Sequence, residues 1–451
     1  VASVGRGARH WLLLGVAVNL GLLGYFKYTG LLLDTVNLAL DLSLPSPDIV
    51  LPLAISFFTF QQIAFLADAR QGKVAPVGIT EYLLFVTFFP QLIAGPIVHH
   101  AEMMPQFRQA ADQRDRLLDY QLGLSLFVMG LAKKVLLADN LAPIADLAFA
   151  TADAGNTLPW ALAAMGVVAF SLQIYFDFSG YSDMALGIAR LFGIRLPANF
   201  FSPYRARNII EFWRLWHITL SRFLRDYLYI PLGGNRRGRP RRYLNLMMTM
   251  LLGGLWHGAS VNFVLWGGVH GLMLGVNHGW HSLLRQWGVQ GWQQHRVYVF
   301  AGGGLTLLLV CLAWIPFRAE TLTGALHMAQ ALLVPATEPL APFYKGRAGE
   351  AHLLLNSLLP APLGLARLWQ LVCATDLLLL GSGVAVCLLL PNSLQLTAAY
   401  QPSITATPQA AAAPLSLCWK PTPGWGIWLG ILFLLSVLSF ARVTPFLYFQ
   451  F

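Results

Sequence analysis

The chain has 451 residues, of which 56% are hydrophobic and 11% are charged, and its mean hydropathy is +0.59. An average soluble domain carries roughly 25% charged residues, so this composition excludes a soluble globular protein. Thirty basic and twenty acidic residues give a net charge of +10. Nucleic-acid binding would need this charge on a polar, water-facing domain, and the chain has almost no polar stretch. We therefore expect membrane lipid as a partner and no nucleic acid.

Uncharged stretches mark the candidate membrane spans, because about 20 mostly apolar residues are needed to cross a hydrocarbon core of ~30 Å. They are residues 49–67, 82–98, 154–176, 297–317 and 421–441, the 42-residue stretch 243–284, and the shorter segments 11–26, 120–132 and 377–390. We predict an all-α polytopic membrane protein with roughly nine to eleven transmembrane helices. Some of the shorter helices are expected to be re-entrant or interfacial.

The spans show no internal repeat, and we expect residues 1–451 to form a single membrane-embedded domain. The four cysteines form no CxxC pair, which argues against a disulfide framework and against a zinc site. No two histidines share a helix face with a carboxylate at a metal-binding spacing. We therefore expect no metal.

Basic residues concentrate between Phe201 and Asn245, where ten arginines stand against only Glu211 and Asp226. The positive-inside rule places this segment at the cytoplasmic face. Two interpretations of the arginines remain open. They either only fix the topology and contact lipid headgroups, or they bind an anionic cytosolic substrate.

Part of this segment, from Glu211 onwards, has the pattern of an amphipathic helix. At about 100° per residue, Arg214, His217, Ser221 and Arg225 share one face, and aromatic side chains occupy the opposite arc. This pattern predicts a helix at the membrane interface with a basic stripe. A simple surface helix explains most of the pattern, but it does not explain a titratable His217 within the stripe.

Two further histidines, His257 and His270, lie in the longest uncharged stretch. Ionisable groups at membrane depth are expensive and are candidates for function. The two are 13 positions apart, so they fall on different faces of a straight helix, and a break or turn near Gly267 and Gly268 would bring them together. The alternative for each histidine is a hydrogen-bonded core residue.

Five ordered segments carry a family resemblance: residues 88–107, 175–200, 211–238, 251–271 and 445–451. In these segments the chain resembles the membrane-bound O-acyltransferase family, and within it the bacterial branch that includes alginate O-acetyltransferase. Members of the family generally begin with one or two further hydrophobic segments. The resemblance therefore implies that this chain lacks the extreme N-terminal segment.

The resemblance also assigns residues. The essential histidine of the family lies in a Leu-Trp-His-Gly motif, which corresponds here to His257. A second histidine, in a Trp-His-Ile-Ser motif, corresponds to His217, with Thr219 in place of serine. We expect both to be catalytic residues.

Acyl transfer from a thioester to a hydroxyl needs a base, hydrogen-bond donors for the developing oxyanion, and alignment of two substrates. His257 suits the role of the base, because an apolar environment favours the neutral imidazole. His217, Asn262 or backbone N–H groups are the alternatives for polarising the thioester carbonyl.

The donor is expected to bind on the arginine side of the membrane. Arg214, Arg225, Ser221 and Asn262 are the candidate donor-binding residues, since arginine forms bidentate contacts with phosphates. The resemblance implies acetyl-CoA as a cytosolic donor and no permanently bound cofactor.

The resemblance further implies a bacterial inner-membrane enzyme that passes the acetyl group through a central tunnel. The acetyl group is received outside the cytoplasm by an acetyltransferase partner protein, which modifies a polysaccharide such as alginate. D-alanyl transfer to wall polymers and acylation of lysophospholipid are alternatives within the family. A proton-coupled transporter or exporter is the alternative of another class, although two similar halves, expected of a transporter, are not found.

Overall fold

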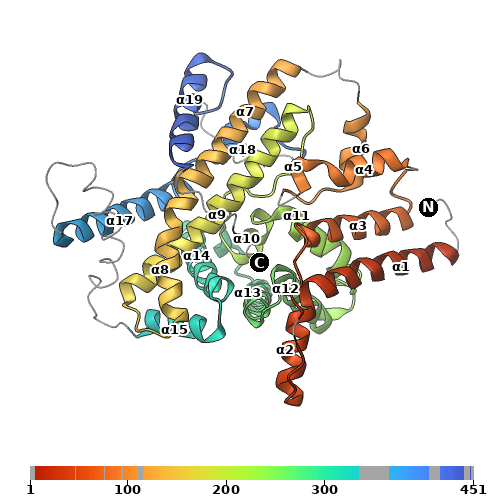
Figure 1. Ribbon diagram of the computed structural model, residues 1–451, viewed down its shortest axis with the longest axis horizontal. Coiled ribbons are helices and arrows are strands. Elements are labelled where there is room, and N and C mark those ends of the chain that lie inside the picture. Colours follow the sequence, from red (N-terminus) through yellow and green to blue (C-terminus); the bar gives the residue numbers. More distant parts are fainter. Residues whose placement is uncertain are drawn as a thin grey trace.

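The computed structural model describes residues 6–45, 47–75, 77–92, 95–109, 115–334, 365–405, 417–440 and 447. Within these ranges every regular element is a helix, which confirms the all-α prediction (Figure 1). The N-terminal elements are α1 (Arg6–Leu23), η1 (Gly24–Tyr28), α2 (Thr29–Leu40), α3 (Ile55–Arg70), α4 (Ile79–Thr87), α5 (Phe89–Leu92) and α6 (His100–Arg108). The central elements are α7 (Arg116–Ala132), η3 (Lys133–Ala138), α8 (Asp139–Asp153), α9 (Trp160–Leu191), η4 (Pro203–Arg205), α10 (Ile209–Leu215), α11 (Ile218–Leu224), η5 (Arg225–Tyr229), α12 (Gly238–His257) and α13 (Val261–Gln286). The later elements are η6 (Gln290–Gln294), α14 (Arg296–Arg318), α15 (Leu322–Leu333), α17 (Leu365–Leu389), α18 (Ser393–Leu396), η7 (Ala398–Tyr400) and α19 (Pro423–Leu438).

Four helical stretches of the described chain are long and apolar enough to cross a membrane. They are Arg9–Leu40, Arg116–Asp153, Trp160–Leu191 and Arg296–Arg318. Three shorter apolar helices accompany them, at Leu322–Leu333, Cys373–Leu389 and Pro423–Leu438. The fold is that of a polytopic membrane protein, whereas the count of nine to eleven spans stays a prediction.

The predicted span at residues 82–98 is not one helix. The chain forms α4 and then the one-turn helix α5, with Phe88 between them in an extended conformation. Pro90 lies in the first turn of α5, and Pro96 follows beyond its end. A proline lacks the N–H that continues a helix, so neither piece is long enough to span a bilayer.

The longest helices pack through glycines. The rod formed by α7, η3 and α8 lies along α9 (Figure 1). A Cβ on Gly123 would lie 2.8 Å from the Gly187 carbonyl oxygen, and one on Gly180 would lie 2.7 Å from that of Gly130. The absence of side chains at these positions therefore sets the close approach of α7 and α9, as is common between membrane helices.

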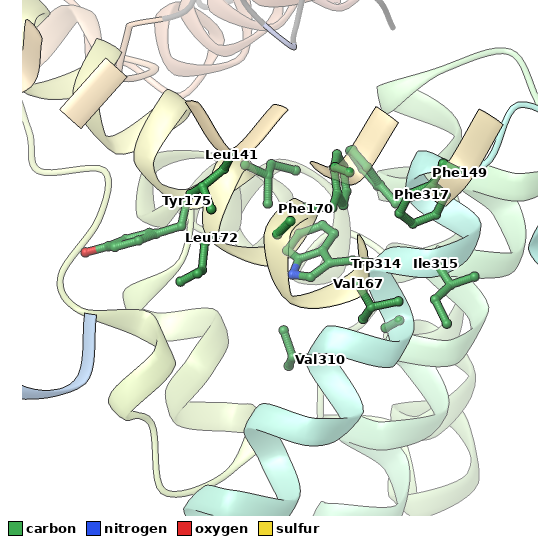
Figure 2. Close-up of a cluster of buried hydrophobic side chains, with 14 of the residues drawn as sticks. Leu141, Phe149, Val167, Phe170, Leu172, Tyr175, Val310, Trp314, Ile315 and Phe317 are labelled. Carbon is green, nitrogen blue, oxygen red and sulfur yellow. The ribbon is translucent and has the colours of Figure 1, made fainter. Parts of the chain in front are cut away.

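Large aromatic side chains join α8, α9 and α14 in the main hydrophobic core. Figure 2 shows Trp314 and Phe317 of α14 beside Phe149 of α8 and Phe170 of α9. The rings of Phe149 and Phe170 are 5.7 Å apart between centroids, and those of Trp314 and Phe317 are 5.2 Å apart. This core holds the end of α14 against the region that contains the histidines.

Ion pairs connect η3 to the long helix α9. In η3, Lys133 contacts Asp183 at 2.5 Å and Lys134 contacts Asp177 at 2.8 Å. Both aspartates belong to α9, and Asp183 also accepts a hydrogen bond of 2.6 Å from Ser393. These bonds compensate the desolvation of charges buried between helices, so they connect η3 to α9 and α18.

The helices α12 and α13 form an antiparallel hairpin near the centre of the molecule (Figure 1). The chain turns at residues 258–260, where Gly258 is extended and the Ser260 side chain caps α13 by accepting from the Asn262 N–H at 3.2 Å. The prediction of a break near Gly267 and Gly268 was wrong, because α13 is continuous through both. Gly267 instead lies against the backbone of α12, where a Cβ would clash with the Met250 carbonyl.

Candidate active site

His257 is the last residue of α12 and is 5% exposed. Its ring lies 4.9 Å from that of Trp256, 5.1 Å from that of Trp266 and 5.2 Å from that of Phe317, measured between centroids. These neighbours come from α12, α13 and α14. We call the residues around this ring, Trp256, Phe263, Trp266 and Phe317, the aromatic chamber.

His217 lies where the helix is interrupted, between α10 and α11. Its φ of 42° places it in the left-handed region, and its side chain is 0% exposed. A left-handed conformation is unfavourable for a residue with a Cβ. The prediction of a single amphipathic helix was therefore wrong, because α10 ends at Leu215 and α11 begins at Ile218.

Asn199 stabilises the break at His217. Its side-chain oxygen lies 3.1 Å from His217 Nδ1 and accepts hydrogen bonds from the Thr219 N–H and hydroxyl at 3.3 and 2.9 Å. Thr219 Oγ1 in turn accepts from the Ile97 N–H at 3.0 Å. The sequence analysis missed Asn199, although it is the second-last residue of the matching segment 175–200.

The break separates the residues that were expected to form one basic stripe. Arg214 and Arg225 are exposed, Ser221 is partly buried, and His217 is buried. Arg225 binds the neighbouring Asp226 through two hydrogen bonds of 2.7 and 3.0 Å, and the Ser221 hydroxyl donates to the Trp216 carbonyl at 3.4 Å. Donor binding by these three residues stays a prediction.

Trp256 brings the two candidate catalytic histidines into one site. Its ring lies 6.2 Å from that of His217 and 4.9 Å from that of His257, between centroids. His257, at the end of α12, and His217, between α10 and α11, therefore contact the same indole ring. Their catalytic roles stay predictions.

His270 packs against Trp266, one of the rings of the aromatic chamber. It is 0% exposed, and its ring lies 4.7 Å from that of Trp266. The indole N–H of Trp213 donates to His270 Nδ1 at 3.3 Å. Since Nδ1 accepts this bond, Nε2 carries the proton in the neutral ring.

Three buried N–H donors around His257 have no hydrogen-bond partner within the described residues. They are Trp256 Nε1, Trp266 Nε1 and His270 Nε2. Buried donors are usually satisfied, and an exception calls for an explanation such as a bound ligand. These three N–H groups belong to side chains that pack against His257 or against Trp266.

Asn262 lies at the turn between α12 and α13, next to the end of α14. It is buried at the start of α13, and its side-chain N–H donates to the Ala319 carbonyl at 2.8 Å. This bond ties the α12–α13 turn to the end of α14. The role of Asn262 in polarising or binding the donor stays a prediction.

The arginine-rich segment contains a second connected set of polar residues. Arg222 of α11 binds Glu102 of α6 through bonds of 2.6 and 3.0 Å. The Tyr227 hydroxyl donates to Asp68 at 2.7 Å and lies 3.1 Å from His99 Nδ1. These contacts connect α11 to α6 and η5 to α3 on the side that is predicted to be cytosolic.

Comparison with known proteins identifies the family. The sequence profile of MBOAT, the membrane-bound O-acyltransferase family, matches residues 25–311. Peptidoglycan O-acetyltransferase of Helicobacter pylori is 44% identical over 353 residues, which are 72% of this chain and 65% of that protein. Probable alginate O-acetylase AlgI of Pseudomonas aeruginosa is 37% identical over 472 residues, covering 99% of this chain and 86% of that protein. Teichoic acid D-alanyltransferase of Streptococcus thermophilus is 31% identical over 242 residues, covering 51% of this chain and 57% of that protein. The chain therefore belongs to the membrane-bound O-acyltransferase family.

Proposed function

We propose that this protein transfers an acetyl group from acetyl-CoA at the cytosolic face of the bacterial inner membrane to a hydroxyl on its other side. The acceptor proposed is an extracellular polysaccharide of the alginate class, reached through an extracytoplasmic acetyltransferase partner. The observation that carries the proposal is the buried His257 in the aromatic chamber, beside N–H donors that find no acceptor among the described residues. The similarity to the probable alginate O-acetylase of Pseudomonas aeruginosa over 99% of this chain supports the choice of acceptor.

In the proposed reaction, a ring nitrogen of His257 takes the proton from the acceptor hydroxyl while that oxygen attacks the thioester carbonyl carbon. The carbonyl π electrons move to oxygen, and the C–S bond breaks when they return. Coenzyme A leaves as a thiolate and takes the proton from the imidazolium. The products are an O-acetyl ester and free coenzyme A, so His257 is regenerated without another reactant.

The negative charge that develops on the carbonyl oxygen needs prepositioned donors. Trp256 Nε1, Trp266 Nε1 and His270 Nε2 are buried and have no other acceptor in the described chain. We assign this role to them rather than to Asn262, whose N–H donates to Ala319. A site with low dielectric strengthens such hydrogen bonds.

The exposed Arg214 and Arg225 belong to the segment with a net charge of +8, from ten arginines and two acids. We assign the phosphates of acetyl-CoA to this side, because guanidinium groups bind phosphates in a bidentate manner. In this arrangement the acyl group enters from the cytosolic side, and a tunnel between the helices carries it to His257.

A D-alanyl group is the second candidate for the transferred acyl group, supported by the match to teichoic acid D-alanyltransferases over about half of the chain. Acylation of lysophospholipid lacks such support among these relatives. Membership of an acyltransferase family weighs against the transporter alternative. The acetyl donor is favoured because the relatives with more extensive matches are named for acetyl transfer.

The test uses the purified protein in detergent micelles with acetyl-CoA radiolabelled in its acetyl group and with alginate oligosaccharide as the source of acceptor hydroxyls. We expect release of free coenzyme A that depends on protein concentration and is lost in His257→Gln. Turnover of D-alanine loaded on a carrier, without turnover of acetyl-CoA, would replace the acetyl donor by the second candidate. Turnover of neither thioester by the folded protein would contradict the proposal.

A further inference from the structure

Lys27 is a charged residue inside the N-terminal span Arg9–Leu40, and it contacts the end of α12. Its ammonium group donates to the carbonyl of Trp256 at 2.7 Å and to that of His257 at 3.0 Å. It also lies within hydrogen-bond distance of the Ser56 hydroxyl, at 3.3 Å. The next residue, Tyr28, donates its hydroxyl to the Leu255 carbonyl at 2.8 Å. Two consecutive side chains thus bind the last three carbonyls of α12.

These carbonyls need partners from outside their helix. The last four C=O groups of an α-helix have no intrahelical donor. A left-handed residue after the helix often supplies N–H groups to them, but Gly258 is extended, with φ of −165° and ψ of 156°. Lys27 and Tyr28, which are distant in the sequence, donate hydrogen bonds to these carbonyls instead.

The charge of Lys27 matches its position electrostatically. The C-terminus of a helix carries roughly half a negative elementary charge, and the ammonium group lies directly at this end of α12. Within the described part of the chain, no carboxylate lies in ion-pair distance of Lys27. A cation at membrane depth is costly and is a candidate for function by default, and here its partners are the backbone of the candidate catalytic residue and its neighbour.

Local structure places both side chains. Residues Gly24–Tyr28 form η1, a turn of π-helix between α1 and α2. Such turns are rare and occur frequently at functional sites. The π-helical turn is confined to this part of the span Arg9–Leu40. In the same region, α1 packs against α3.

We propose that Lys27 is a positioning residue for His257. By holding the carbonyls of Trp256 and His257, its ammonium group fixes the end of α12 and therefore the orientation of the imidazole in the aromatic chamber. This inference rests on the proposed function, in which His257 is the general base. The competing explanation is that Lys27 only anchors the N-terminal helices to the rest of the molecule.

The two explanations differ in their kinetic effects. A mere anchor, when removed, lowers the amount of folded protein and its melting temperature but leaves each folded molecule active. A positioning residue, when removed, lowers kcat per folded molecule, because a displacement of about 1 Å in an active site can cost on the order of 100-fold in rate. KM for acetyl-CoA changes little in that case, since the binding contacts of the donor are elsewhere.

The experiment compares four variants in detergent: Lys27→Met, Lys27→Arg, Tyr28→Phe and the control Lys73→Met. Lys73 is a lysine whose side chain is 62% exposed. Initial rates of coenzyme A release are measured against acetyl-CoA concentration, together with the melting temperature.

We expect Lys27→Met to lower kcat by roughly 10- to 100-fold while KM stays within about twofold. Lys27→Arg keeps the charge and the N–H donors, so we expect it to recover part of the loss. Tyr28→Phe removes one neutral bond and has a smaller effect. Lys73→Met has the rate of the unmodified protein.

The inference is overturned if folded Lys27→Met has the unmodified kcat, or if its activity falls only in proportion to the folded fraction. His257→Gln, measured in parallel, separates the two proposals. If His257→Gln is inactive and Lys27→Met is fully active, only the positioning role of Lys27 fails. If His257→Gln itself retains activity, the proposed function of His257 fails first.

Discussion

Replacing His257 by glutamine removes the ring nitrogen that is proposed to take the proton, while a polar side chain of similar length remains. Loss of a general base typically lowers the rate by a factor on the order of 10² to 10⁴, which corresponds to about 2.7 to 5.4 kcal/mol of transition-state stabilisation. We expect kcat for acetyl-CoA turnover to fall within this range, with little change in KM.

The same substitution also has a structural cost, which can be judged from the packing. The His257 ring is 5% exposed and has ring neighbours at 4.9, 5.1 and 5.2 Å. Aromatic pairs contribute about 0.5 to 1.5 kcal/mol each, so three contacts limit the destabilisation to a few kcal/mol. Rates must therefore be expressed per folded molecule, determined by size-exclusion chromatography and thermal melting.

His100 provides a matched control. It is also 5% exposed, and its ring lies 5.1 Å from that of Phe65 and 5.3 Å from that of Phe85. It belongs to α6 and lies outside the aromatic chamber. His100→Gln is expected to lower the melting temperature to a similar extent and to keep kcat per folded molecule. If His257→Gln keeps more than about a tenth of the rate, His257 is not the general base, and His217 and His270 become the candidates.

Three further predictions address the donor, the topology and the oxyanion. Arg214→Gln and Arg225→Gln should raise KM for acetyl-CoA more than they lower kcat, because contacts between arginine and phosphate are similar in the ground and transition states. If KM is unchanged and membrane insertion is impaired, the arginines serve only to fix the topology. A cysteine at Arg237, introduced after replacement of the native cysteines, should not react with an impermeant maleimide in intact cells, and strong labelling would reverse the proposed topology. Trp266→Phe keeps an aromatic ring but removes the N–H, so kcat should fall by a factor on the order of 10² at nearly constant KM; kcat equal to that of the unmodified protein would exclude this donor.

Hydrophobic composition alone determined the fold class. Long uncharged stretches become helices in a bilayer because each backbone N–H and C=O must find a partner within the segment, and this rule needs no information about neighbours. Residues 297–317, for example, were predicted as one span and form most of α14. The position of His257 in a long uncharged stretch likewise predicted a buried histidine.

The local geometry of the site was not predictable in the same way. A helical wheel assumes a continuous helix, whereas His217 adopts a left-handed conformation beside Asn199, which accepts hydrogen bonds from Thr219. The glycines at 267 and 268 suggested a turn, but Gly267 serves the contact between α12 and α13. Periodicity along the chain contains no information about which helix will lie against a given glycine.

The amino-acid sequence by itself determined an all-helical membrane protein with a histidine in an apolar stretch, because hydrophobicity and helical hydrogen bonding are local properties. Only the tertiary structure decided what surrounds that histidine. Lys27 reaches the carbonyls of Trp256 and His257 across 229 and 230 positions of the chain. A side chain can bind any unsatisfied backbone carbonyl, so its partner is decided by which helix end the packing of the spans places beside it.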